Sequence, residues 1–430
     1  MHYLRTLLVL LAGLASARLD ILDDPPSLET AVHIGSRDSV ALATDSTTSS
    51  QGGHKLLVGS AGQIRGVDFD GTIFTPRENA HVKEPGKTAS WMVFKKPNLL
   101  YAVDENSDKI RLFAYDPQVN ALTDEPKSFN GTSGVVHLAF TPDQTRLIAS
   151  SYGKGAVDIW NSSTADGTLR LIKTVLLQGA PGPDPAAQTQ LRAHQSVTDP
   201  TGQFVAVNDL GGDMIHNLDA ALDSYSVAKV VETDPGCGPR HGGFLQLDGG
   251  TQATHYAVVC EIGNTIHLFS VSYGDTAADV TFQHVHAHST FGAAFPPLNA
   301  TTARAGALLI ARSGAIYVSN RLTGNQTDSI SHFALEAKSQ DETTPQLVFK
   351  GCVSSGGVGP RMMSWSHDEG TMFIANMNGV NGLVALKKDA ATGVLDGEPL
   401  GVLTNEALAP DQPVEQGFGS MFVQELAWVA

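Results

Sequence analysis

The sequence predicts an all-β protein whose antiparallel blades surround a central channel, as in a seven-bladed β-propeller. One observation is a short pattern that recurs seven times: an apolar run, an acidic or amide cluster, and a second β run. The cores of these copies are spaced at intervals of roughly 44 to 60 residues, as in propeller blades. In addition, turn dipeptides such as Asp-Gly and Asp-Pro join the strands directly, with no helical period between them.

The copies follow one another from residue 55 without a domain-sized gap. The first, KLLVGSAGQIRGVDFD (55–70), is weak and lacks a front strand. The clearer copies are LYAVDENSDKIRLFAYD (100–116), RLIASSYGKGAVDIWN (146–161), QFVAVNDLGGDMIHNLD (203–219), HYAVVCEIGNTIHLFSV (255–271), AIYVSNRLTGNQTDSISHFAL (315–335) and TMFIANMNGVNGLVALKKD (371–389). Because a lone blade cannot bury its faces, we expect one domain over 55–430.

The two ends of the repeat region are expected to close the ring. The segment SMFVQELAWV (420–429) is β-like and has no partner copy, whereas the first copy lacks its front strand. The C-terminal segment should supply that strand, since closure removes the exposed edges of the sheet.

Residues 1–17 are expected to form a secretory signal peptide. Arg5 precedes an apolar stretch over 7–14, and the Ala15-Ser16-Ala17 cleavage site follows it. Residues 18–54 are interpreted as an N-terminal segment and linker, with a strand near 31–34. Four N-x-[ST] sequons follow, at Asn130, Asn161, Asn299 and Asn325. We therefore expect a secreted, N-glycosylated protein.

The net charge of the chain limits the partners that it can bind. The net charge of −16 argues against binding to nucleic acid or to an anionic membrane, so neither is expected as a partner.

Among three cysteines, Cys237 and Cys260 belong to one repeat and are the expected disulfide pair. The alternative is that they and Cys352 are all small buried apolar residues. The oligomeric state stays open.

The repeat also predicts where polar residues gather. The start of one strand of an antiparallel hairpin and the end of the next lie at the same edge. Front strands begin near His137, His194, Arg240 and Arg361, and second strands end near Asp104, Glu105, Asn208, Asp209, Glu261, Asn320, Arg321 and Asn376. If front strands line the channel, these residues converge on one of its mouths, and the opposite mouth consists of Asp-Gly-type turns.

A mouth of this kind fits a small anionic molecule. The guanidinium groups of Arg240, Arg321 and Arg361 could bind carboxylates or a phosphate. His194 and Glu261 could exchange protons with a substrate. The alternative is that these polar residues only satisfy backbone groups at strand ends.

The segments GPRH (238–241) and CEIGNTIHLF (260–269) resemble the pattern of the seven-bladed lactonase family. That family includes propeller-type 6-phosphogluconolactonases, fungal carboxy-cis,cis-muconate cyclases and secreted fungal-type members. Supporting matches are AHQSVTDPTGQFVAVNDLGGDMI (193–215), IYVSNR (316–321) and PRMMSWSHDEGTMFIANMN (360–378). The resemblance covers roughly 55 to 430.

The resemblance implies lactone hydrolysis or muconate-type cycloisomerisation at one channel mouth, without a metal or other cofactor. The family's conserved quartet falls on His194, Arg240, Glu261 and Arg321, which are the expected catalytic residues. The expected substrate-binding residues around them are His137, His241, Arg361, Asn320 and Asn376.

Two alternatives stay open. The chain could be a secreted propeller that binds a small ligand or a protein without turnover, because propellers host many functions. The alternating His284, His286 and His288 could bind a metal, or they could lie on an exposed strand. Because neither G-x-S-x-G nor H-E-x-x-H is present in the sequence, α/β-hydrolase and zinc-protease interpretations lack support.

Overall fold

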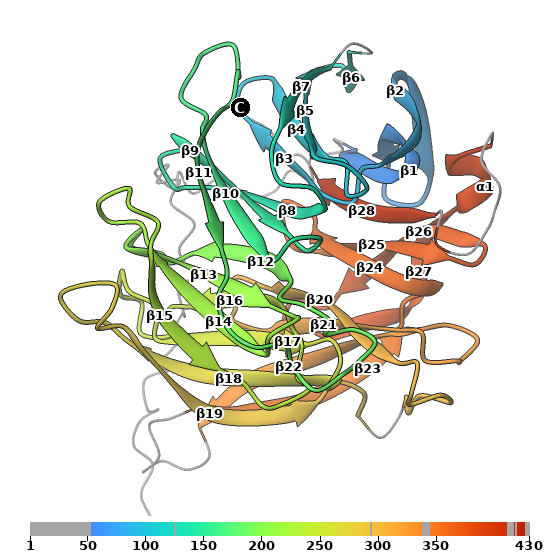
Figure 1. The fold of residues 1–430 in the computed structure, drawn as a ribbon. Helices are drawn as coiled ribbons and strands as arrows, with labels where there is room; N and C mark the ends of the chain where they lie inside the picture. The colour runs from blue at the N-terminus through green and yellow to red at the C-terminus, as the bar shows by residue number, and fades with distance from the viewer. Residues whose placement is uncertain are drawn as a thin grey trace, which may run out of the picture. The chain divides into compact units, whose positions relative to one another are not determined.

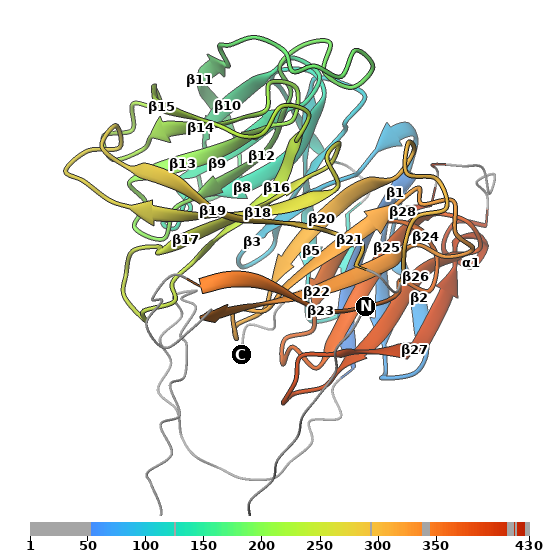
Figure 2. The same cartoon turned by 90° about the horizontal axis from the view of Figure 1, so that it is seen from below.

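The computed structural model describes residues 53–123, 126–292, 295–337, 345–410, 417 and 419–425. Their strands form seven antiparallel sheets arranged in a ring, so the predicted seven-bladed all-β fold is confirmed (Figures 1 and 2). The signal peptide expected over 1–17 and the strand expected near 31–34 lie outside the described residues. Within the described part of the chain, no helix is long and apolar enough to cross a membrane.

Five of the sheets have four strands each, in chain order from the inner to the outer edge. The third sheet comprises β8 (Val135–Phe140), β9 (Arg146–Ser151), β10 (Ala156–Asn161) and β11 (Arg170–Leu176), and the fourth β12 (Ala193–Thr198), β13 (Phe204–Asp209), β14 (Met214–Asp219) and β15 (Val227–Glu232). The fifth comprises β16 (Pro239–Leu245), β17 (His255–Cys260), β18 (Thr265–Ser272) and β19 (Thr281–Ser289). The sixth comprises β20 (Arg304–Ile310), β21 (Ile316–Arg321), β22 (Ser329–Ala337) and β23 (Pro345–Ser354), and the seventh β24 (Val358–Trp365), β25 (Thr371–Asn378), β26 (Asn381–Lys388) and β27 (Leu395–Thr404).

The first sheet joins the two ends of the described chain. It consists of β1 (His54–Phe69), β2 (Phe74–Thr88) and β28 (Ser420–Glu425), and β28 pairs antiparallel with β1. Closure of the ring by the C-terminal segment is therefore confirmed. The second sheet consists of β3 (Met92–Lys95), β4 (Leu99–Val103), β5 (Lys109–Asp116), β6 (Ala121–Leu122) and β7 (Lys127–Asn130), and a short helix α1 (Asn405–Leu408) follows β27.

The first copy of the repeat differs from the others, because it lies almost entirely in one long strand, β1 (His54–Phe69), rather than in a hairpin. Its first half pairs with β28 and its second half with β2. Between the halves the register shifts from Ala61 to Gln63, at a bulge where Gly62 has a φ of +78°. Glycine adopts this left-handed conformation without steric cost, so the strand bends instead of turning back.

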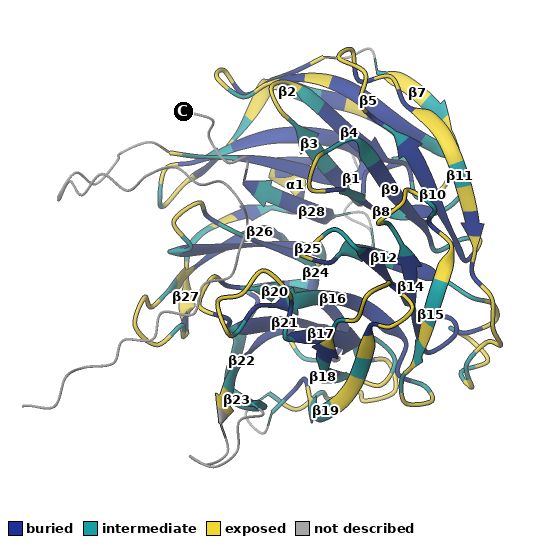
Figure 3. Ribbon diagram, turned by 90° about the vertical axis from the view of Figure 1, so that its left-hand side faces the viewer, coloured by how far each residue is buried: buried dark blue, intermediate teal, exposed yellow. Residues whose placement is uncertain are grey.

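Apolar side chains hold the ring together at every junction between neighbouring sheets. Seven clusters of buried residues each draw on two adjacent sheets. Phe422 of β28 packs with Phe113 at one junction, and Phe204 packs with Tyr256 at another. Full burial of each such side chain contributes about 1.5–3 kcal/mol to the free energy of unfolding. The outermost strands β11, β15 and β19 carry most of the exposed positions in these three sheets (Figure 3).

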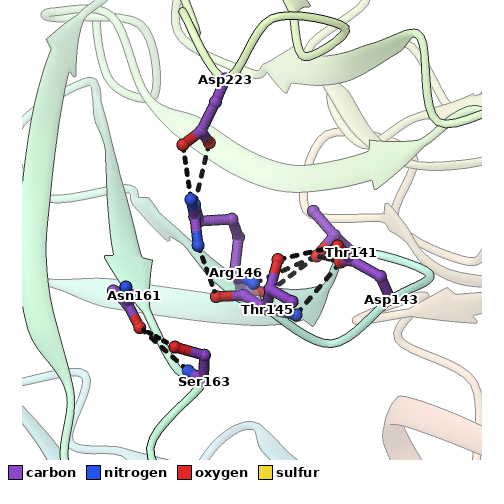
Figure 4. Close-up of polar contacts among 7 residues, drawn as sticks. All are labelled: Thr141, Asp143, Thr145, Arg146, Asn161, Ser163 and Asp223. Atoms are coloured by element: carbon purple, nitrogen blue, oxygen red, sulfur yellow. Dashed lines mark hydrogen bonds and ion pairs between the residues drawn. The ribbon is translucent and has the colours of Figure 1, made fainter.

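The turn between β8 and β9 illustrates the end of the ring that the sequence predicted to be made of plain turns. Asp143 accepts a hydrogen bond from the backbone N–H of Thr145 at 3.1 Å, as turn aspartates commonly do. Arg146 donates from Nε and Nη2 to the carboxylate of Asp223 in the fourth sheet, at 2.8 and 2.5 Å (Figure 4). This bidentate pair ties two adjacent sheets at that end.

Candidate active site

A cavity of about 350 Å³ lies at the opposite end, where inner strands begin and second strands end. Six of the seven sheets contribute to its wall. The lining residues are Glu105, Asn106, Gly134, Val136, Tyr152, Gly153, His194, Arg240, Glu261, Arg321 and Arg361. Ring closure thus gathers side chains that are far apart in the sequence.

The four residues expected to be catalytic all line this cavity. His194 and Arg240 are the second residues of β12 and β16. Glu261 directly follows β17, and Arg321 is the last residue of β21. The antiparallel pairing within each sheet brings these positions to one edge, as the strand pattern predicted.

Glu261 lies between two arginines at the centre of the cavity wall. Its Oε2 atom is 2.7 Å from Nε of Arg240 and 2.7 Å from Nη2 of Arg321. Arg321 Nη2 also donates to the carbonyl oxygen of Ala305 at 3.2 Å. The side chain of Glu261 is 21% exposed. One carboxylate oxygen therefore contacts both guanidinium groups, while the side chain stays partly accessible from the cavity.

Burial and the charges of the cavity arginines determine the protonation states of Glu261 and His194. Burial raises the pKa of Glu261, but Arg321 and Arg240 together outweigh this effect and lower it below the ordinary value. Burial, followed by the charges of Arg240 and Arg361, lowers the pKa of His194 well below its ordinary value. At neutral pH Glu261 is consequently ionised and His194 is a neutral imidazole.

Arg361, expected to bind substrate, also lines the cavity. Its Nη2 atom is 2.6 Å from Oε2 of Glu105, and its Nη1 atom lies 3.7 Å from Sδ of Met421. Asn106 and Tyr152 complete this side of the wall and were not predicted. Tyr152 directly follows β9 just as Glu261 follows β17, so its repeat position could have revealed it.

Two further predicted ligand-binding residues, His137 and His241, are not among the residues that line the cavity. Both are buried, and Nε2 of His241 is 3.2 Å from Nη1 of Arg240. The ring of His241 is 5.2 Å from that of His194, and the ring of His137 lies 4.4 Å from Trp91. Burial lowers the pKa of His137 to about 3. Both histidines pack next to residues of the wall, and their expected contact with a ligand stays a prediction.

Asn320 and Asn376 are not brought to the cavity, although both were expected to bind substrate. Each is completely buried. Asn320 donates from Nδ2 to the carbonyl oxygen of Thr290 and to two serine hydroxyls, and Asn376 donates to the carbonyl oxygen of Ser355. Side chains alternate along a strand, so Asn320 faces away from the cavity that its neighbour Arg321 lines.

The alternating histidines lie on the outermost strand of the fifth sheet, β19. Within the described residues, the side chains close enough to share a metal are Cys237, Cys260 and His267. There the two sulfur atoms are joined in a disulfide, which confirms the predicted pairing and leaves Cys352 free. The disulfide lies three residues before Arg240 and directly before Glu261, so it fastens the two chain segments that carry them.

Comparisons with known proteins identify the family of this chain. Residues 48–406 match the family model described as lactonase, 7-bladed beta-propeller. The chain is 29% identical over 359 residues to a probable 6-phosphogluconolactonase of Arthroderma benhamiae, covering 81% of this chain and 86% of the relative. The periplasmic gluconolactonase of Pseudomonas aeruginosa shares the fold with a TM-score of 0.70 at 21% identity, over 87% of this chain and 99% of that structure. A protein from Lactobacillus plantarum does so with a TM-score of 0.65 at 21% identity, over 82% and 99%. This chain therefore belongs to the seven-bladed β-propeller lactonase family.

Proposed function

We propose that this protein is an enzyme that hydrolyses a small anionic lactone in the cavity at the channel mouth. The observation that carries the proposal is the shared contact of Arg240 and Arg321 with one oxygen of Glu261. This arrangement keeps a carboxylate ionised beside two buried cations in the wall of the cavity. A general base next to positive charge suits attack on a carbonyl group that becomes negative.

In the proposed reaction, Glu261 removes a proton from water as the water oxygen attacks the lactone carbonyl carbon. The guanidinium groups of Arg240 and Arg321 stabilise the oxyanion that forms, because they lie in a site largely withdrawn from water. The bond between the carbonyl carbon and the ring oxygen then breaks. The ring oxygen takes the proton back from Glu261, giving the open hydroxy acid. Neutral His194 orients the water or the ring oxygen by hydrogen bonding.

The electrostatics favour hydrolysis over muconate-type cycloisomerisation. The cyclisation requires delivery of a proton to an alkene carbon while a carboxylate adds to the double bond. The pKa of Glu261 is lowered by its two arginines and that of His194 is lowered well below its ordinary value, first by burial. Neither group therefore holds an acidic proton at neutral pH.

The substrate is proposed to be a carboxylated or otherwise acidic sugar-type lactone. The names of the relatives, a probable 6-phosphogluconolactonase and a gluconolactonase, support this class. Arg361 would bind the anionic group of the substrate, since it also lines the cavity and its guanidinium group could exchange Glu105 for a substrate carboxylate or phosphate. We also propose that the protein acts outside the cell, on the basis of its N-terminal sequence.

The test is a panel of aldonolactones and acidic lactones with the purified wild-type protein and its Glu261→Gln variant. We expect the variant to lose about 10²- to 10⁴-fold in kcat, because it removes a general base. The matched control is Glu369→Gln, a glutamate that also contacts two cations, Arg312 and Lys388, but lies away from the cavity. Equal turnover in wild type and Glu261→Gln would exclude the proposed mechanism.

A propeller that binds an anion without turnover is the second candidate, because the same arginines would hold such a ligand. In that case the wild type hydrolyses none of the lactones in the panel. The ring-opened hydroxy acids would then bind equally to wild type and Glu261→Gln, or more tightly to the variant because a negative charge is lost.

A further inference from the structure

Two buried aspartates outside the cavity wall, Asp213 and Asp328, connect neighbouring sheets beside the proposed active site. They are 6% and 1% exposed. Asp213 lies in the turn between β13 and β14 of the fourth sheet, and Asp328 directly precedes β22 of the sixth. Neither was singled out by the sequence pattern.

Asp213 holds the loop that leads into β16. Its Oδ2 atom accepts a hydrogen bond from the backbone N–H of Gly236 at 2.7 Å. Its Oδ1 atom accepts from the N–H of Gly238 at 2.7 Å and from Nε2 of Gln188 at 2.7 Å. The carboxylate thus fixes the backbone two residues before Arg240.

The peptide groups of Gly238 extend this link to Glu261. While the N–H of Gly238 donates to Asp213, its carbonyl oxygen accepts from the N–H of Glu261 at 2.9 Å. A short chain of hydrogen bonds therefore runs from Asp213 through Gly238 to the backbone of Glu261, and Gly238 itself lies two residues before Arg240.

Asp328 makes the corresponding connection between the sixth and seventh sheets. Its Oδ2 atom accepts from the N–H of Leu322 at 3.0 Å and from the N–H of Gly359 at 2.7 Å. Leu322 directly follows Arg321, and Gly359 lies two residues before Arg361. One carboxylate therefore holds the backbone beside two cavity arginines that belong to different sheets.

We infer that Asp213 and Asp328 are positioning residues, which set the cavity arginines and Glu261 at contact distance by fixing the backbone across two sheet junctions. A carboxylate suits this task because it offers only acceptors to converging N–H groups, and charge-assisted hydrogen bonds are strong. An asparagine would turn its own N–H₂ group towards one of these donors. The effect on turnover rests on the proposed function, whereas the effect on geometry does not.

The experiment compares Asp213→Asn with a matched control, Asp199→Asn. Asp199 is also fully buried, accepts from the N–H groups of Phe204 and Thr201, and contacts Tyr273 of the fifth sheet. It lies in the turn between β12 and β13, away from the cavity. Both variants lose the same kind of interaction, so both should have lower melting temperatures.

Only Asp213→Asn should change the active site. We expect kcat on the best lactone to fall about 10²-fold, as for a misplacement of about 1 Å, while Asp199→Asn keeps the wild-type value. The acid limb of the pH–rate profile should also move to higher pH in Asp213→Asn alone, because Arg240 would no longer lower the pKa of Glu261 fully. If Asp213→Asn does not fold, Asp328→Asn is tested instead. We expect this variant to bind the lactone more weakly, because Arg361 and Arg321 would be displaced.

Crystal structures of the variants separate this inference from the proposed function. The separation of 2.7 Å between Nε of Arg240 and Oε2 of Glu261 should be lost in Asp213→Asn and kept in Asp199→Asn. An unchanged contact in Asp213→Asn, or an equal loss of activity in both variants, overturns the inference. If the contact is lost but the wild type opens no lactone, the inference stands and the proposed function fails.

Discussion

Arg361 and Glu105 form an ion pair at 2.6 Å although they belong to the seventh and second sheets, which are not neighbours in the ring. The first sheet, with Met421 of β28, lies between them and contacts Arg361. The pair therefore spans the sheet that the C-terminal strand β28 completes. It also reduces the positive charge that the cavity offers to an anion.

Removing Glu105 should therefore strengthen substrate binding. In Glu105→Gln, Arg361 loses its competing carboxylate, and we expect KM for an anionic lactone to fall by a factor of about 1.4 to 5, since a partly exposed pair contributes about 0.2–1 kcal/mol. Steady-state kinetics at constant ionic strength measures this effect, with Glu369→Gln as the control. A rise in KM would instead mean that Glu105 itself contacts the substrate.

The acid limit of turnover should depend on Arg321. Glu261 accepts a proton only when ionised, so activity is present above its pKa and is lost as the pH falls through that value. Arg321 and Arg240 lower this pKa against the effect of burial. In Arg321→Gln one of the two charges is lost, so the acid limb should move to higher pH. A pH–kcat profile checks the direction, and an unchanged or lower limb would exclude Glu261 as the titrating base.

The repeat allowed the fold, the closure and the gathering of polar residues at one mouth to be predicted, because a blade register places corresponding residues at one edge, whereas the choice of the quartet came from the family resemblance. It did not reveal which face of a strand each polar residue occupies near a bulge. Asn320 and Arg321 are adjacent, yet one fills a junction and the other lines the cavity. His241 belongs to the same GPRH segment as Arg240 but lies behind it. The repeat did not reveal the roles of Asp213 and Asp328, because these carboxylates accept hydrogen bonds from backbone groups of the next sheet.

The disulfide should stabilise the fold as well as hold the site. Cys237 and Cys260 are separated by 23 positions, and closing a loop of this size contributes about 3 kcal/mol to the free energy of unfolding. The double variant Cys237→Ser/Cys260→Ser should lose about this amount in equilibrium denaturation. Cys352→Ser, at the free and half-buried thiol, should change it much less. Equal losses in both variants would contradict a role for the cross-link.

The exposed sequons should carry N-linked glycans if the protein is exported through a glycosylating pathway. Asn130 and Asn299 are exposed, whereas Asn161 and Asn325 are half-buried and Asn325 donates from Nδ2 to the carbonyl oxygen of Pro296. We expect carbohydrate on the first two sites in protein secreted by a eukaryotic host. Endoglycosidase treatment followed by peptide mass spectrometry measures it. A secreted protein without glycan at either site would contradict the prediction.

Closure by β28 should be essential to stability, and Phe422 provides the test. This side chain is 1% exposed, and its ring lies 5.6 Å from that of Trp91. Truncating a buried phenylalanine removes its packing and leaves a cavity, so Phe422→Ala should lower the free energy of unfolding by about 3–5 kcal/mol. Ile73→Ala is the control, because Ile73 is 63% exposed and should contribute little. A loss in Phe422→Ala as small as in the control would mean that the first sheet holds the ring closed without its C-terminal strand.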